Sequence, residues 1–123
     1  VPQLLRYDSS YYRCWLDRAR RFAGGVLDPV VAGHDRAIGI LQRLPDTFIH
    51  GEFYPSNVLL QSKGSGMRVC PVDWEMAGVG PSLFDVAALA SGKWKRPERL
   101  RMLAEYWAAL PEAARSGVQP VAP

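Results

Sequence analysis

The sequence has few cysteines and no long apolar stretch. Its two cysteines, Cys14 and Cys70, lie far apart without metal-ligand spacing, so neither a disulfide framework nor a cysteine zinc site is indicated. Both lie among apolar residues, which predicts reduced, buried thiols in a cytoplasmic protein. No apolar run approaches the roughly 20 residues that span a bilayer, and no signal-peptide pattern opens the chain. We therefore expect neither a membrane protein nor a disulfide-stapled secreted domain.

The charge of the chain is moderate. The 123 residues are 48% hydrophobic and 22% charged, which is typical of a globular domain, and the net charge is +3. The arginines are spread over several segments, and the densest cluster, Arg13 to Arg21, is interpreted as a solvated helix face. A nucleic-acid partner is therefore not expected. Since the sequence opens on Val1 and not on Met, we expect residues 1–123 to be one partial domain.

Hydrophobic periodicity predicts two helices before the middle of the chain, over residues 9–23 and 29–44. Ser9 or Ser10 is a candidate cap for the first, and Asp28 for the second. The predicted inward face of the first helix comprises Tyr12, Trp15, Leu16, Ala19 and Phe22.

Two further helices are predicted after the middle, over residues 82–91 and from Pro97 onward. The predicted inward residues of the last helix are Leu100, Leu103, Trp107 and Leu110. Residues 111–123 are rich in Pro, Gly and Ala and are expected to be a frayed tail.

A β-hairpin is predicted between these helix pairs. Two short apolar runs, 57–61 and 67–72, flank a glycine-containing separator, and residues 46–56 before them are expected to be a loop. With the turn centred on Ser65, Asn57 lies opposite Asp73, within one residue. The fold class is therefore α+β, mainly helical, with one small hairpin.

The open end of this hairpin gathers oxygen ligands. Opposed residues have Cβ atoms about 4.5–5.5 Å apart, so the Asn57 amide and the Asp73 carboxylate should converge. Such ligands suit Mg²⁺ bound with substrate phosphates, while Glu52, on the entering loop, could accept a proton from a hydroxyl. The alternatives are an Asn–Asp hydrogen bond that closes the ribbon and a polar turn that caps a buried strand. The spacing alone leaves these alternatives open.

Several motifs in order resemble those of one enzyme family. They are His50-Gly51-Glu52 followed by Asn57, then Val72-Asp73-Trp74-Glu75, and Gly80-Pro81 followed by Asp85. This series is similar to the aminoglycoside phosphotransferase and choline kinase family, which has a protein-kinase-like fold. The resemblance is clearest over residues 49–89. It implies that the chain is the C-terminal lobe of such a kinase.

The resemblance implies a role for each matching residue. Glu52 would be the catalytic base that orients the acceptor hydroxyl, although the family's usual base is Asp. Asn57 and Asp73 would hold Mg²⁺ on the phosphates of ATP. His50 would support the catalytic loop, and Asp85 would brace it from the third helix. The local alternative for Asp85 is a capping interaction with Ser82 at the start of its own helix.

A kinase of this type also has an N-terminal lobe with a phosphate-covering loop and a strand lysine. The lysines here, Lys63, Lys93 and Lys95, do not lie in such a pattern, so we expect that lobe to be missing from this sequence. The resemblance thus implies an ATP- and Mg²⁺-dependent phosphotransferase that acts on a hydroxyl of a small molecule, with the lone lobe inactive. The alternative is a degenerate or truncated lobe that binds a partner without turnover.

Overall fold

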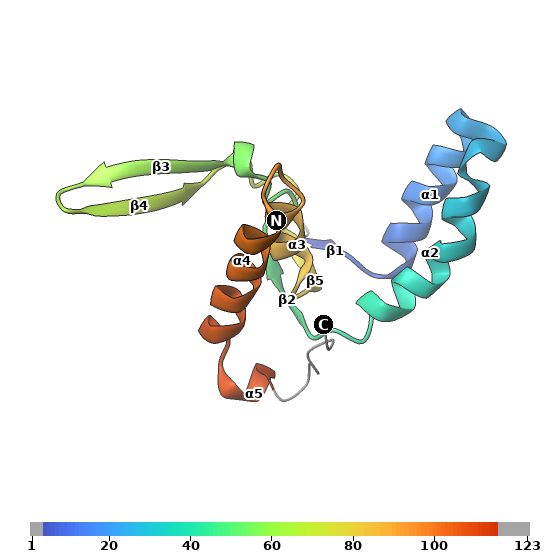
Figure 1. Cartoon of the computed structure of the whole chain (residues 1–123). Coiled ribbons are helices and arrows are strands. Elements are labelled where there is room, and N and C mark those ends of the chain that lie inside the picture. The colour runs from blue at the N-terminus through green and yellow to red at the C-terminus, as the bar shows by residue number, and fades with distance from the viewer. Residues whose placement is uncertain (1–3, 116–123) are drawn as a thin grey trace.

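The computed structural model describes residues 4–115, and a small central sheet joins its helical parts (Figure 1). The strands are β1 Leu5–Arg6, β2 Asp46–Ile49, β3 Val58–Lys63, β4 Gly66–Pro71 and β5 Gly78–Pro81. The α-helices are α1 Ser9–Ala23, α2 Asp28–Leu41, α3 Phe84–Ala90, α4 Arg96–Ala109 and α5 Glu112–Arg115. Two 3₁₀ turns, η1 Gly24–Leu27 and η2 Pro55–Asn57, complete the described order. The β3–β4 hairpin and the α1–α2 pair project from opposite sides of the sheet.

The central sheet has the strand order β1-β5-β2, and it was not predicted. β5 pairs in parallel with β1 and antiparallel with β2. Residues 46–49 were expected to be loop, which is wrong, because they form β2 and pair with residues 78–81. The strands are two to four residues long, and β5 reads Gly-Val-Gly-Pro, so no alternating pattern marks them. The glycines are needed there, since a Cβ at Gly78 would lie 2.5 Å from the Leu5 carbonyl oxygen.

The first helix has the predicted bounds but a different cap. The Asp8 carboxylate, and not Ser9 or Ser10, accepts hydrogen bonds at its start: from the backbone N–H of Ser10 and of Tyr11, each at 3.0 Å, and from the Ser10 hydroxyl at 2.6 Å. The Ser10 hydroxyl, followed by the Tyr11 N–H, lowers the pKa of Asp8. Asp8 therefore occupies the capping position one residue before the predicted candidates.

The second helix, α2, ends before its predicted limit at residue 44. Arg43 and Leu44 donate instead to the carbonyls three residues earlier, so the chain tightens into a turn ahead of Pro45. Leu27 precedes the helix without a side-chain cap, so Asp28 is not the N-cap but lies in the first turn. This turn delivers the chain to β2 and then to the polar loop.

The predicted inward faces of α1 and α4 are only partly covered: none of their residues is fully buried, and those that are half-buried are Tyr12, Leu16, Trp107 and Leu110. Phe22 is 93% exposed, and Trp15, Leu100 and Leu103 are each more than two-fifths exposed. The reason is that α1 packs against α2 and η1, while α4 faces α3 through the side that carries Met102 and Tyr106. The prediction of buried thiols is also wrong, because Cys14 is exposed and Cys70 is only half-buried.

The later helices lie close to their predicted positions. α3 begins two residues after Ser82, and α4 starts at Arg96 with Pro97 in its first turn. The Glu98 carboxylate accepts a hydrogen bond from the Lys95 N–H at 2.6 Å, which is one of the two bonds of a capping box. The expected frayed tail is partly helical, since α5 begins at Glu112, and residues 116–123 lie outside the described part.

The hairpin forms with a register one residue away from the prediction. Lys63 pairs with Gly66 around a two-residue loop in which Gly64 has a φ of 60°. A positive φ at the first loop residue is the pattern of a type II′ turn, which matches the twist of the strands. Asn57 therefore lies opposite Val72, whose N–H donates to the Asn57 carbonyl at 2.9 Å. Asp73 is one residue further along.

The buried residues lie in and beside the central sheet, in α3 and, for Ile38, in α2. The described core consists of Tyr7, Ile38, Ile49 and Val86, together with the polar His50. Gly51 lies beside them with a φ of 86°, a conformation that side chains with a Cβ rarely adopt. A Cβ here would also overlap the Met76 carbonyl and the Tyr7 hydroxyl. Among the described helices, none has the length and apolar character required to cross a bilayer.

We expect Gly51→Ala to lower the free energy of unfolding by about 3 kcal/mol or more, because backbone strain adds to overlap with a rigid carbonyl. Gly64→Ala is the matched control: its φ is also positive, but no atom lies within 4 Å of its added Cβ. It should lose only about 1 kcal/mol. Urea titration followed by circular dichroism measures both, and equal losses would contradict the packing argument.

Candidate catalytic loop

His50 ties the polar loop to the base of the hairpin. It is the last residue before the chain turns away from β2 and is only 2% exposed. Its Nε2 lies 2.9 Å from the Val72 carbonyl oxygen, and its Nδ1 accepts the Glu52 N–H at 3.3 Å. Since Nδ1 accepts, Nε2 carries the proton and donates to Val72. One neutral imidazole thereby fixes both the loop and the point where β4 ends.

Asp85 holds the same loop from the first turn of α3. Its Oδ2 accepts the His50 N–H at 2.6 Å, and its Oδ1 accepts the Gly51 N–H at 3.0 Å. The capping alternative is wrong, since the start of α3 has no side-chain cap. Two charge-assisted bonds to adjacent amides fix the loop in both position and direction.

Tyr7, which directly follows β1, lies beside the same loop at Gly51. Its hydroxyl donates to the Met76 carbonyl at 2.6 Å, and its ring lies 5.1 Å from that of Phe84. Burial, and then the neighbouring Tyr11, raises the pKa of the Tyr7 hydroxyl well above its usual range. The hydroxyl therefore stays protonated and keeps donating at neutral pH.

The Asn57 side chain bonds back to the loop through its amide nitrogen, and its amide oxygen is left available. Its side-chain NH₂ donates to the Glu52 carbonyl at 3.0 Å. The amide nitrogen is thus occupied, and the amide oxygen remains an acceptor. Because the Asn57 backbone also pairs with Val72, the residue links the Glu52 loop to the hairpin base.

Asp73 has an unusual backbone conformation. Its φ is 68°, and it is the one non-glycine residue with positive φ in the described part of the chain. Such a conformation costs about 1–3 kcal/mol and is concentrated at functional sites. The carboxylate is exposed and follows directly after Val72, which contacts both His50 and Asn57.

The structure thus brings His50, Glu52, Asn57 and Asp85 together through direct bonds, and Asp73 follows the hairpin base. Within residues 4–115, no three His, Cys, Asp or Glu side chains are grouped as a metal site. An amide oxygen with one carboxylate would not form such a group, and it fits a cation that takes its remaining ligands from phosphates and water. The five roles suggested by the sequence remain predictions.

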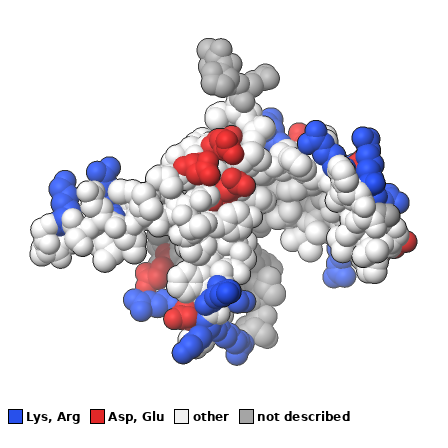
Figure 2. All heavy atoms as spheres, turned by 90° about the horizontal axis from the view of Figure 1, so that it is seen from above, with Lys and Arg blue, Asp and Glu red and all other residues white. Residues whose placement is uncertain are grey.

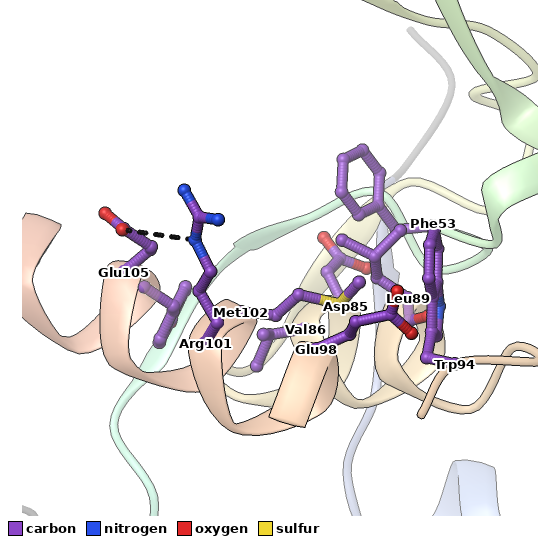
Figure 3. A pocket seen from close by; sticks show the side chains of 10 residues that line it. Phe53, Asp85, Val86, Leu89, Trp94, Glu98, Arg101, Met102 and Glu105 are labelled. Carbon is purple, nitrogen blue, oxygen red and sulfur yellow. Dashed lines mark hydrogen bonds and ion pairs between the residues drawn. The ribbon is translucent and has the colours of Figure 1, made fainter. Parts of the chain in front are cut away.

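Sequence reasoning missed two parts of this region. One is the support from Tyr7 and Val72, which act through a hydroxyl and a backbone carbonyl and carry no motif. The other is a cavity of about 550 Å³ between α3 and α4 that reaches the loop at Phe53 (Figure 3). Its signal was the isolated Trp94 in a polar stretch, whose indole N–H donates to the Leu89 carbonyl at 2.7 Å.

We expect Asp85→Asn to lower the free energy of unfolding by roughly 2–4 kcal/mol, because the amide nitrogen cannot accept and would face a backbone N–H. Asp35→Asn is the control, since its carboxylate is 79% exposed and pairs only with the exposed Arg13. An exposed pair contributes at most about 1 kcal/mol. Chemical denaturation of both variants decides, and similar losses would exclude Asp85 as the anchor of the loop.

Comparison with known proteins agrees with the motif series. No curated protein and no solved structure matched the chain in the searches. A comparison with protein families matches residues 2–120 to a phosphotransferase enzyme family. The matched range contains the polar loop, the hairpin and the five α-helices described within residues 4–115. The chain therefore belongs to the phosphotransferase enzyme family.

Proposed function

We propose that this chain is the catalytic lobe of an ATP- and Mg²⁺-dependent kinase that phosphorylates a hydroxyl of a small molecule. The observation that carries the proposal is the rigid loop from His50 to Asn57. Its backbone is fixed by Asp85 and His50, while the Glu52 side chain, the Asn57 oxygen and Asp73 are left for chemistry. Phosphoryl transfer depends mainly on such positioning and on charge neutralisation.

Glu52 is the proposed general base. Its backbone is held at both ends, because its N–H bonds to His50 and its carbonyl accepts from Asn57. The side chain is half-buried, so a substrate hydroxyl can reach it. A base held this way orients the acceptor oxygen and takes its proton as the bond to phosphorus forms.

Asn57 and Asp73 are the proposed ligands of Mg²⁺. The available amide oxygen and the exposed carboxylate are hard donors of the type that Mg²⁺ prefers. When bound, the cation would neutralise charge on the transferred phosphoryl group. Figure 2 supports a cationic cofactor, since acidic side chains gather on the central body, between the projecting hairpin and the α1–α2 pair. Lys and Arg side chains lie on those projections.

The N-terminal lobe of the family's fold is proposed to be supplied by chain outside this sequence. Residues 1–123 alone should then show no phosphoryl transfer. The rival function is a non-catalytic binding module with the same loop. Magnesium-dependent ATP consumption by the complete gene product, measured with a panel of alcohols, separates the two. Tight Mg-ATP binding without turnover for any alcohol would favour the module.

In the complete gene product, we expect Glu52→Gln to lower kcat by about 10²–10⁴-fold, because the amide cannot accept the hydroxyl proton. The KM for ATP should change little, since Glu52 serves the acceptor. Glu112→Gln, an exposed substitution in α5, is the control and should leave kcat unchanged. Steady-state kinetics decide, and an unchanged kcat in Glu52→Gln would remove Glu52 from the mechanism.

We expect Asp73→Asn to abolish turnover at saturating Mg²⁺ while the fold is retained. Asn loses the anionic ligand but tolerates the left-handed φ of 68°, so the backbone need not change. Asp17→Asn, on the exposed face of α1, is the matched control for loss of one charge. The readouts are kcat and melting temperature, and a near wild-type kcat in Asp73→Asn would reject the metal assignment.

A further inference from the structure

The cavity between α3 and α4 is apolar and adjoins the candidate catalytic loop. Its volume of about 550 Å³ lies within the 300–1,000 Å³ range of small-molecule sites. Val86 and Leu89 of α3 face Met102 of α4 across it, and Phe53 and Trp94 flank it (Figure 3). Phe53 directly follows Glu52, so the cavity and the proposed base share one segment of chain.

The cavity and the candidate catalytic loop also share one side chain, that of Asp85. Asp85 lines the cavity and, with the same carboxylate, accepts the His50 and Gly51 amides. A shift of the cavity wall at Asp85 would therefore also move the loop at His50 and Gly51. A ligand held against Phe53 and α3 would have a fixed position relative to Glu52, which is what an acceptor substrate requires.

The charged side chains at the cavity are already engaged. Asp85 bonds to two amides, Glu98 caps α4 through the Lys95 N–H, and Glu105 lies 3.9 Å from Arg101. These carboxylates outnumber the guanidinium, which disfavours an anionic ligand. The aliphatic and aromatic walls offer the many hydroxyls of a sugar few partners.

We propose that this cavity binds the body of the acceptor, and that the acceptor is an alcohol with a predominantly apolar body. This inference rests on the proposed kinase function. It narrows the acceptor class to alcohols that bury apolar surface against α3 and α4 and present a hydroxyl toward the loop at Glu52. The same walls disfavour polyhydroxylated sugars, whose hydroxyls would be buried without partners.

The test begins with binding, which is independent of catalysis. The full 123-residue chain is titrated by calorimetry with 2-(1-naphthyl)ethanol and, separately, with the aminoglycoside kanamycin. The apolar alcohol should bind at least tenfold more tightly. Met102→Trp, which fills the cavity, should weaken its binding at least tenfold. Leu103→Trp, the next residue of α4 and outside the lining, should change it less than twofold.

Three binding results would overturn the proposal: equal effects of the two substitutions, no binding of the alcohol, or binding of kanamycin that is as tight. Sedimentation of the same variants tests other occupants. If Met102→Trp changes the oligomeric state and not the affinity, a second copy covers the groove. That result also rejects the proposal.

Kinetics of the complete gene product then separate this inference from the kinase function. Met102→Trp should raise the KM for apolar alcohols at least tenfold while the KM for ATP is unchanged. Transfer to alcohols that is insensitive to Met102→Trp would keep the kinase and reject the cavity as its acceptor site. Cavity-dependent alcohol binding without transfer to any acceptor would reject the kinase and, with it, the role of the ligand as acceptor.

Discussion

The site depends on the two hydrogen bonds that the Asp85 carboxylate accepts from the His50 and Gly51 backbone N–H groups. They join α3 to the residue that directly follows β2, and His50 and Asp85 lie 35 positions apart in sequence. Once His50 is fixed, its imidazole sets Val72 on one side and the Glu52 amide on the other. The hairpin base and the polar loop thus take their positions from one buried ring and one carboxylate.

In this arrangement, the groups that hold the loop are different from the groups that are left for a reaction. The supporting groups are used up: both Asp85 oxygens, both His50 nitrogens and the Asn57 NH₂ have partners. The Glu52 side chain, the Asn57 amide oxygen and the exposed Asp73 carboxylate are not used in this support. A rigid frame with a few unsatisfied groups at its edge is what preorganised catalysis needs, since little reorganisation is left for the reaction.

The sequence predicted the elements that carry periodic or turn signals and missed those that do not. The bounds of α1 and the presence of the hairpin followed from apolar spacing and from the Gly64 turn. The three-stranded sheet did not, because strands as short as Leu5–Arg6 and Gly78–Pro81 are defined by pairing and not by pattern. The register of the hairpin lies one residue from the predicted centre, within the stated margin, because the loop has two residues. The motif series grouped the site residues, but the role of Tyr7 could not be predicted, because a hydroxyl bonded to a distant carbonyl leaves no local trace.

Gly51 limits how this chain can change over generations. Every single-base change in a glycine codon that alters the residue introduces a Cβ or a stop signal. At Gly51 any Cβ meets the Met76 carbonyl and the Tyr7 hydroxyl. No codon that differs by one base therefore encodes a tolerated residue at Gly51. At Gly33 no atom lies within 4 Å of an added Cβ, so a substitution there meets no such obstacle. Substitutions in this chain should therefore accumulate more readily at Gly33 in α2 than at Gly51 in the loop.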